Sequence, residues 1–226
     1  MYEEDSVGRI WFDEDSFIAP FGHFAKDYDY VINYLRDPFI SERTYFEGFD
    51  ENVLLNNYAQ YLKLGGSGWI GFHKKKRAAY IILEIVSRQP LIYSVHGGLS
   101  KELFGKKYGA KSMEFIKDFV FNKKSATKLE GYLLHPNNFI KGYFKRGGLS
   151  KECELKDRIL LDGKLSPINI YGLTREDYLN NKEKHYGWKS LKATSRPKSS
   201  RSGSSTDEST RRRKAKTRSR KKRKCR

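Results

Sequence analysis

The stretch HPNNFIKGYFKRGGLSKECELKDRILLDGKLSPINIYGLTREDY, residues 135–178, decides the fold of this chain. Near its start, Ile140, Tyr143 and Phe144 recur at the spacing that places side chains on one face of a helix. The Gly147-Gly148 pair follows, and glycine readily adopts the left-handed conformation in which many helices end. The stretch therefore predicts a short helix that stops at these glycines, with a strand directly after it.

A hairpin is expected after this helix. Two runs of strand-forming residues, 149–161 and 164–173, flank Asp162-Gly163, a dipeptide that tolerates positive φ and favours a tight turn. The chain continues with Thr174-Arg175-Glu176-Asp177, which predicts a helix N-cap with an acidic first turn. Helix, glycine stop, hairpin and capping phrase thus occur together and in order.

This layout resembles the closing half of the GNAT acyltransferase superfamily, especially its branch that acetylates protein N-termini. In that branch an Asn opens the short helix and a Gly closes it, at the spacing of Asn137 and Gly148, and a phrase similar to YGLTREDY, residues 171–178, follows the hairpin. The resemblance covers residues 69–178. It implies an α/β fold of the α+β type, in which helices flank a central twisted sheet that is mixed but mostly antiparallel.

The order of elements upstream agrees with this resemblance. Apolar periodicity predicts helices at 28–35, 50–64 and 111–121, strands at 69–72, 78–86, 90–96 and 129–134, and a glycine-containing turn at 104–110. Residues 1–48 otherwise give only weak periodicity. In the family, the turn carries an R/Q-x-x-G-x-G/A motif whose amides, with the following helix N-terminus, hold the pyrophosphate of acetyl-CoA.

The pyrophosphate motif is only partly kept in this chain. Phe104, Lys107 and Gly109 stand at its three defining positions, so the last alone matches. Two readings of Lys107 stay open: it binds phosphate as a point charge, or it occludes the slot that glycine leaves. The acetyl-CoA contacts that the resemblance implies are Tyr93, Val95, Phe104, Gly105, Lys106, Lys107, Gly109, Ala110 and Asn137.

The candidates for catalysis are Tyr143, His96 and Glu84. Many family members use a helix tyrosine as general acid, but Phe144 stands at that position, where a core-facing aromatic is the expected role. The neighbouring Tyr143 carries a hydroxyl, although adjacent helix residues point about 100° apart. His96, at the end of the strand before the turn, and Glu84, on the preceding strand, are candidate bases for an attacking amine, and each also has a purely structural reading.

The positive charge of the chain is concentrated at its C-terminal end. The 226 residues include 45 Lys and Arg against 27 Asp and Glu, a net charge of +18, and residues 189–226 hold 17 basic and 2 acidic ones, a net of +15. We therefore expect a GNAT-like domain at 1–188 and a disordered tail at 189–226. The basic cluster expected to bind DNA or RNA phosphates comprises Arg211, Arg212, Arg213, Lys214, Lys216, Arg218, Arg220, Lys221, Lys222, Arg223 and Lys224. A solubilising or targeting tail is the alternative.

Several classes of protein are not expected. No His or Cys cluster has the spacing of a metal site, and the longest apolar run, 80–86, contains Glu84, so neither a metal nor a membrane partner is predicted. The acidic start MYEEDSVGRIW is unlike a secretion signal. The expected location is cytoplasmic or nucleic-acid-associated, or the virion interior if the protein is viral.

The sequence leaves two functions open. The first is an N-acyltransferase that moves an acetyl group from acetyl-CoA to an amine, either a protein N-terminus or a small molecule, with the tail holding the enzyme near nucleic acid. The alternative is a catalytically inactive GNAT-fold protein that binds nucleic acid in a structural or packaging role, as in phage virion interiors. Whether the protein is an enzyme is therefore undecided at this level.

Removal of residues 189–226 is expected to abolish binding to DNA, because the remaining chain carries only +3 of the net +18 charge. With six phosphates neutralised, the full chain should show a slope of about −5 in log K against log salt concentration. Fluorescence anisotropy with a labelled duplex over a salt series measures both. Binding that is equally tight and equally salt-dependent after truncation would rule out this role for the tail.

Overall fold

The computed structural model describes residues 8–21, 25–40, 51–133, 137–161 and 164–181. They form an eight-stranded sheet in the order β1-β2-β3-β4-β5-β6-β8-β7. Its strands are β1 (Ile10–Asp13), β2 (Ser16–Pro20), β3 (Ser67–His73), β4 (Lys76–Arg88), β5 (Leu91–Leu99), β6 (Lys128–Leu133), β7 (Ser150–Leu161) and β8 (Lys164–Thr174). Neighbouring strands are antiparallel except for the parallel pair β5 and β6. The expected mixed, mostly antiparallel sheet is confirmed.

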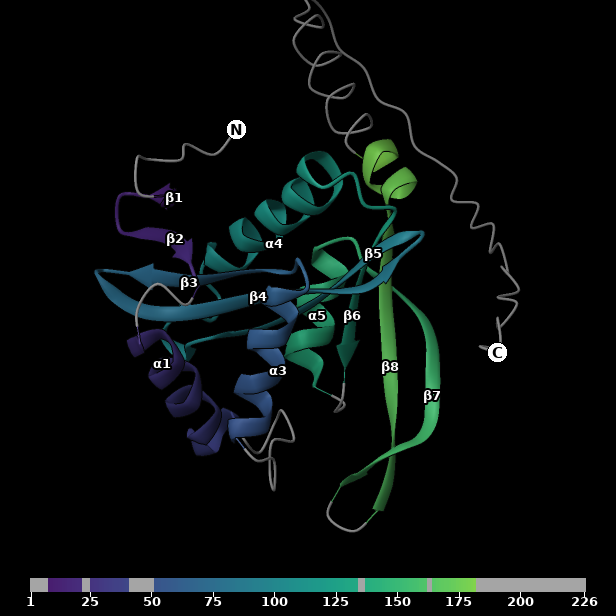
Figure 1. The fold of residues 1–226 in the computed structure, drawn as a ribbon, viewed down its shortest axis with the longest axis horizontal. Helices are drawn as coiled ribbons and strands as arrows, with labels where there is room; N and C mark the ends of the chain where they lie inside the picture. Colours follow the sequence, from purple (N-terminus) through teal and green to yellow (C-terminus); the bar gives the residue numbers. More distant parts are fainter. Residues whose placement is uncertain (1–7, 22–24, 41–50, 134–136, 162–163, 182–226) are drawn as a thin grey trace, which may run out of the picture.

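Helices cover both faces of the sheet. They are α1 (Ala25–Arg36), α3 (Glu51–Lys63), α4 (Tyr108–Asp118) and α5 (Asn138–Arg146), with a 3-10 turn at Lys101–Leu103 and a π-helical turn, Phe119–Lys123, that continues α4. Figure 1 shows α4 on one side of β3, β4 and β5, and α1 and α3 on the other. We call these sides the α4 face and the α3 face. None of the helices in these ranges is long and apolar enough to cross a membrane.

Strand β4 contributes to a core on each face, because successive side chains of a strand point to opposite sides. On the α4 face, Ile81 and Leu83 pack in one cluster with the helical residues Met113 and Phe115. On the α3 face, the alternate residue Ile82 joins a second cluster with residues of α1 and α3. This double burial explains why residues 78–83 are apolar without alternation.

The local signals of the closing segment are confirmed. The Asn137 side chain caps α5 by accepting hydrogen bonds from the amides of Phe139, at 3.0 Å, and Ile140, at 3.4 Å. Gly148 has a left-handed φ of +90°. Thr174 Oγ1 accepts from the Asp177 amide at 3.1 Å, and residues 175–181 are helical. The expected turn at 162–163 lies outside the described residues, although β7 and β8 pair up to its edge.

Three expectations need correction. Helix α4 begins at Tyr108, so Gly109 and Ala110 belong to its first turn and not to the preceding loop. Strand β5 runs on to Leu99, three residues beyond the end expected at residue 96. A methyl group at Gly98 would overlap the rings of Tyr34 and Tyr80, so glycine serves close packing there. Strands β1 and β2 were not expected, since their short, half-exposed runs give little periodicity.

The Phe144→Ala variant is expected to lose about 3–5 kcal/mol of stability, the usual cost of emptying a buried phenylalanine site. Phe144 is 5% exposed, and its ring centroid lies 5.3 Å from that of Tyr171. The ring packs so closely on Gly131 that a Cβ at that glycine would overlap it. Urea denaturation measures the loss. Phe139→Ala is a matched control on the same helix, because Phe139 is 41% exposed and its removal should cost far less. Equal losses for the two variants would contradict the assigned core role.

Candidate active site

Strands β5 and β6 separate partway along their length. Their pairing runs from Ile92 opposite Lys128 to Val95 opposite Gly131, and residues 96–99 of β5 lie beyond it. The Ser100 amide donates to Ala78 of β4 at 2.8 Å. Because hydrogen-bonding direction alternates along a strand, the Gly97 peptide group points away from β4, toward β6. We call residues 96–99 on this side the open edge of β5.

A candidate anion site lies where β5 leads into α4. The amides of Tyr108, Gly109 and Ala110 precede the first helical bond, from the Lys111 amide to the Lys107 carbonyl at 3.0 Å, so the helix itself offers them no acceptor. The helix dipole adds partial positive charge at this end. The side chains at 106 and 107 are exposed lysines. Amides, dipole and lysines together suit a phosphate group.

Lys107 does not strain the turn that precedes α4. Its φ of −67° and ψ of −9° are ordinary right-handed values, which any residue adopts. The left-handed position of the turn is Gly105, with φ +75°, where glycine is present. The side chain of Lys107 is exposed. A lysine at this motif position is thus compatible with the backbone that the turn requires.

Gly109, in the first turn of α4, has room for a Cβ. A Cβ there would lie 3.5 Å from the Tyr143 ring and 3.7 Å from Leu99, which are ordinary contacts. The packing of the protein itself therefore does not require glycine at this position. The fit to the pyrophosphate of acetyl-CoA comes instead from the amides that α4 leaves without an acceptor and from the two exposed lysines beside them.

The other residues expected to contact acetyl-CoA have varied surroundings. Phe104 packs on Phe139, with ring centroids 4.3 Å apart, and so links the turn to α5. Asn137 uses its side-chain oxygen to cap α5. Tyr93 is 2% exposed and packs in the core, whereas Val95 is the last β5 residue paired with β6. The open edge begins immediately after Val95.

Tyr143 lies beside the first turn of α4. Its hydroxyl is 3.4 Å from Ser112 Oγ, which donates to the Gly109 carbonyl at 2.9 Å. Burial raises the pKa of Tyr143 to about 12, and the hydrogen bond with Ser112 opposes this only in part. Tyr143 therefore keeps its proton at neutral pH. Phe144 points into the core as expected.

His96 and Glu84 form a pair on the α3 face. Nε2 of His96 lies 2.9 Å from Oε2 of Glu84, and the two side chains are 28% and 27% exposed. Tyr61 of α3 stacks on the imidazole, with ring centroids 5.8 Å apart. An ionised carboxylate only accepts hydrogen bonds, so Nε2 carries the proton and Nδ1 is left able to accept one. The structure thus joins two of the candidate catalytic residues beside the open edge, with Tyr143 on the opposite face.

A pocket of about 200 Å³ lies close to the open edge on the side of α1. Tyr30 and Tyr34 of α1 and Asp37, which follows this helix, line it together with residues 100–102. The Tyr34 hydroxyl accepts a hydrogen bond from the Leu99 amide at 3.2 Å, so the pocket adjoins the last residue of β5. A small molecule thus has room near the open edge from the side of α1.

A polar row that sequence reasoning missed crosses the α3 face. Glu84 of β4, Ser94 of β5 and Glu130 of β6 lie opposite one another in successive strands. Ser94 is fully buried, and its hydroxyl has no hydrogen-bond partner in the described part of the chain, at a cost of about 1–3 kcal/mol. The polar alternation of Lys128, Glu130 and Tyr132 in the sequence was a signal for one polar face, but it does not give the register.

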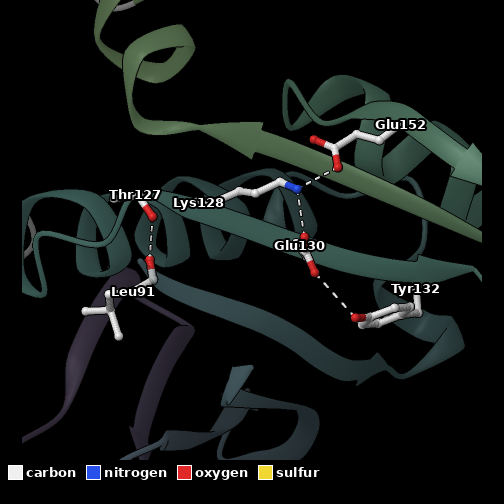
Figure 2. Close-up of polar contacts among 6 residues, drawn as sticks. All are labelled: Leu91, Thr127, Lys128, Glu130, Tyr132 and Glu152. Carbon is white, nitrogen blue, oxygen red and sulfur yellow. Dashed lines mark hydrogen bonds and ion pairs between the residues drawn. The ribbon is translucent and has the colours of Figure 1, made fainter. Parts of the chain in front are cut away.

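Glu130 belongs to a network at the end of this row, shown in Figure 2. Lys128 Nζ donates to Glu130 at 2.7 Å and to Glu152 of β7 at 2.6 Å, so one ammonium lies between two carboxylates. Gly172 of β8 makes room for this bridge, since a Cβ there would overlap Glu152. The Tyr132 hydroxyl donates to the second oxygen of Glu130 at 3.3 Å.

Two expectations concern other parts of the chain. The nucleic-acid-binding cluster at 211–224 lies outside the described residues. Within those that are described, no three His, Cys, Asp or Glu side chains are grouped to hold a metal ion.

Comparison with known proteins gives the fold. No family model matches the sequence, and no curated protein matches it. The similar solved structures include spermidine N-acetyltransferase from Vibrio cholerae in complex with CoA and spermine (TM-score 0.63, 13% identity), ribosomal-protein-S5-alanine acetyltransferase from Vibrio fischeri (0.58, 15%) and a GNAT-family acetyltransferase from Bacillus anthracis (0.58, 15%). They cover 74%, 74% and 72% of this chain and 100%, 97% and 96% of their own. The chain therefore has the fold of the GNAT acetyltransferases.

Proposed function

We propose that the protein transfers an acetyl group from acetyl-CoA to a primary amine. One observation carries the proposal: the His96–Glu84 pair lies beside the open edge of β5, and the same strand leads into the anion site at the start of α4. A base and an anion site on one strand suit a reaction between an amine and an acyl donor with a phosphate-rich handle. The acetyltransferase fold of the similar structures supports this reading.

Residues at both ends of the open edge would hold acetyl-CoA. The amides of residues 108–110, with Lys106 and Lys107, would bind its pyrophosphate. The Gly97 N–H points toward the side where β5 lacks a strand partner and is available to a carbonyl oxygen. Bound there, acetyl-CoA supplies a thioester whose carbonyl carbon accepts the lone pair of an amine.

His96 would act as the general base. A primary amine is mostly protonated at neutral pH and must lose a proton before it attacks. Nδ1 of His96 accepts that proton, while Glu84 holds the ring through Nε2 and stabilises the imidazolium that forms. Glu84 is thus a positioning residue and His96 the catalytic one.

Tyr143 would serve as a hydrogen-bond donor and not as a full proton donor. Its pKa of about 12 lies above the roughly 8.5 of an ordinary thiol, so transfer of its proton to a thiolate would be uphill. Its hydroxyl remains protonated and donates to Ser112, whose own proton goes to the Gly109 carbonyl, and this donor would turn to the sulfur of bound acetyl-CoA. This differs from the acid role that the family assigns to a tyrosine on this helix.

The resemblance to the N-terminal-acetylating branch makes a protein N-terminus one possible acceptor class, and a small amine the other. Both present a primary amine to His96. The charges around His96 bear on the choice between them.

A second candidate function has its own support in the tail. The net charge of +15 over residues 189–226 favours contact with nucleic acid. The domain would then be an inactive nucleic-acid-bound component, for example of a virion interior, or an enzyme held at nucleic acid. Binding of acetyl-CoA would distinguish the inactive protein from an active enzyme, whether or not that enzyme is held at nucleic acid.

Calorimetric titration of the full chain with acetyl-CoA tests the main proposal. We expect saturable binding, and acetylation of a primary amine followed by release of the CoA thiol. His96→Gln should lower kcat by about 10²–10⁴-fold, the usual contribution of a general base, and leave acetyl-CoA affinity unchanged. Absence of heat at millimolar acetyl-CoA would overturn the proposal and favour the inactive protein.

Lys107→Glu tests the anion site separately from the fold. The variant should be about as stable as the parent, because residue 107 is exposed and a carboxylate is favourable beside a helix N-terminus. Its acetyl-CoA affinity should fall, because the new negative charge repels the phosphates of the cofactor. Thermal melting and calorimetry give the two quantities. Unchanged affinity would show that phosphate does not bind at this turn.

A further inference from the structure

Three side chains along one row of the sheet each have an oxygen that receives no strong hydrogen bond. Glu84, Ser94 and Glu130 face the same side from three neighbouring strands, with Ser94 in the middle. Adjacent strands are about 4.8 Å apart, so both carboxylates are within side-chain reach of the Ser94 hydroxyl. An ammonium group has three N–H donors and no acceptor, which is the complement of such a row.

Each carboxylate of the row keeps one oxygen available. Oε2 of Glu84 binds His96, and no hydrogen bond from the described part of the chain reaches its Oε1. Oε1 of Glu130 accepts from Lys128, whereas its Oε2 receives only the Tyr132 hydroxyl at 3.3 Å, beyond the usual O–H···O range of about 2.5–3.0 Å. A charged donor would displace so long a contact.

The unpartnered Ser94 hydroxyl is independent evidence for a ligand. The residue is 0% exposed, and its Oγ has no partner among the residues that the structure describes. Buried hydroxyls are nearly always hydrogen-bonded, so an orphan between two carboxylates marks a place where a further donor is missing. The side chains of Glu84 and Glu130 on either side of it are 27% and 13% exposed, so both reach solvent.

The charges around the row favour a cation. Three carboxylates, Glu84, Glu130 and Glu152, are offset by Lys128 alone, which leaves a net of −2 while His96 is neutral. The rings of Tyr58 and Tyr61 flank His96, and Tyr132 lies at the other side of the row. Carboxylates edged by tyrosine rings are a favourable setting for an alkylammonium ion.

We propose that the acyl acceptor is a small amine with a second ammonium group, and that this second group binds over Ser94 between Glu84 and Glu130. The inference rests on the proposed function. His96 is two residues beyond Ser94 on the same strand, so the two nitrogens of the acceptor are separated by about 7 Å. A linear aliphatic diamine meets this requirement, whereas a protein N-terminus brings a second charge only if its sequence supplies one.

Calorimetry with 1,4-diaminobutane and n-butylamine tests the proposal on the full chain without acetyl-CoA. The diamine should bind about tenfold more tightly or better, since only it brings a second charge-assisted set of hydrogen bonds. Added salt should reduce the difference. Equal affinities for the two amines would overturn the proposal, as would binding of neither.

Glu130→Gln and Glu152→Gln form a matched pair of variants. Both remove one partner of Lys128, but only Glu130 belongs to the row. Glu130→Gln should lose the preference for the diamine, while Glu152→Gln should keep it. Loss of the preference in both variants, or in neither, would mean that the row does not bind the ammonium group.

Ser94→Ala separates a ligand role from a structural one. Removal of an unpartnered hydroxyl should leave the melting temperature unchanged or raise it, while diamine affinity falls. A lower melting temperature with unchanged diamine affinity would overturn the assignment. Acetyl-CoA titration keeps the two proposals distinct: diamine preference without acetyl-CoA binding contradicts the proposed function alone, and acetyl-CoA binding without diamine preference contradicts only the acceptor site.

Discussion

The candidate site depends on the parallel pairing of β5 and β6 and on its early end at Val95 and Gly131. Parallel neighbours cannot be joined by a tight turn, so the chain must cross over the sheet, and α4 provides that crossover. The crossover starts at the end of β5, which brings the N-terminus of α4 to the place where the two strands part. One topological requirement thus gives both an unpaired strand edge and a cluster of free amides beside it.

Features set by a few neighbouring residues could be predicted from the sequence. The cap at Asn137, the left-handed stop at Gly148 and the box formed by Thr174 and Asp177 all involve contacts within four positions along the chain. The periodicity of apolar residues also predicts the long helices and the central strands. The pairing of His96 with Glu84 was less accessible, because it depends on the register of two adjacent strands, yet both residues stood out by type and position.

Features that depend on the register between strands far apart in the sequence, or on backbone angles, could not be predicted. Nothing local places Glu130 in line with Glu84, since 46 positions and a helix separate them, and only the shared strand β5 aligns them. The sequence likewise could not show whether Lys107 strains the turn, and its φ of −67° is one that any residue adopts. Tyr93, assigned to a ligand by its place on β5, proves to be buried, because alternate residues of that strand face the α4 side.

The open edge of β5 also bears on aggregation. Unpaired strand edges are templates on which foreign strands add, and most sheets carry them only at their margins. Here the unpaired segment lies inside the sheet, is only four residues long at 96–99, and is flanked by α4 on one face and by the tyrosines of α3 on the other. A typical strand of about five to six residues with side chains on both faces does not fit such a segment. A segment so short and so enclosed is a poor template for the addition of a foreign polypeptide strand.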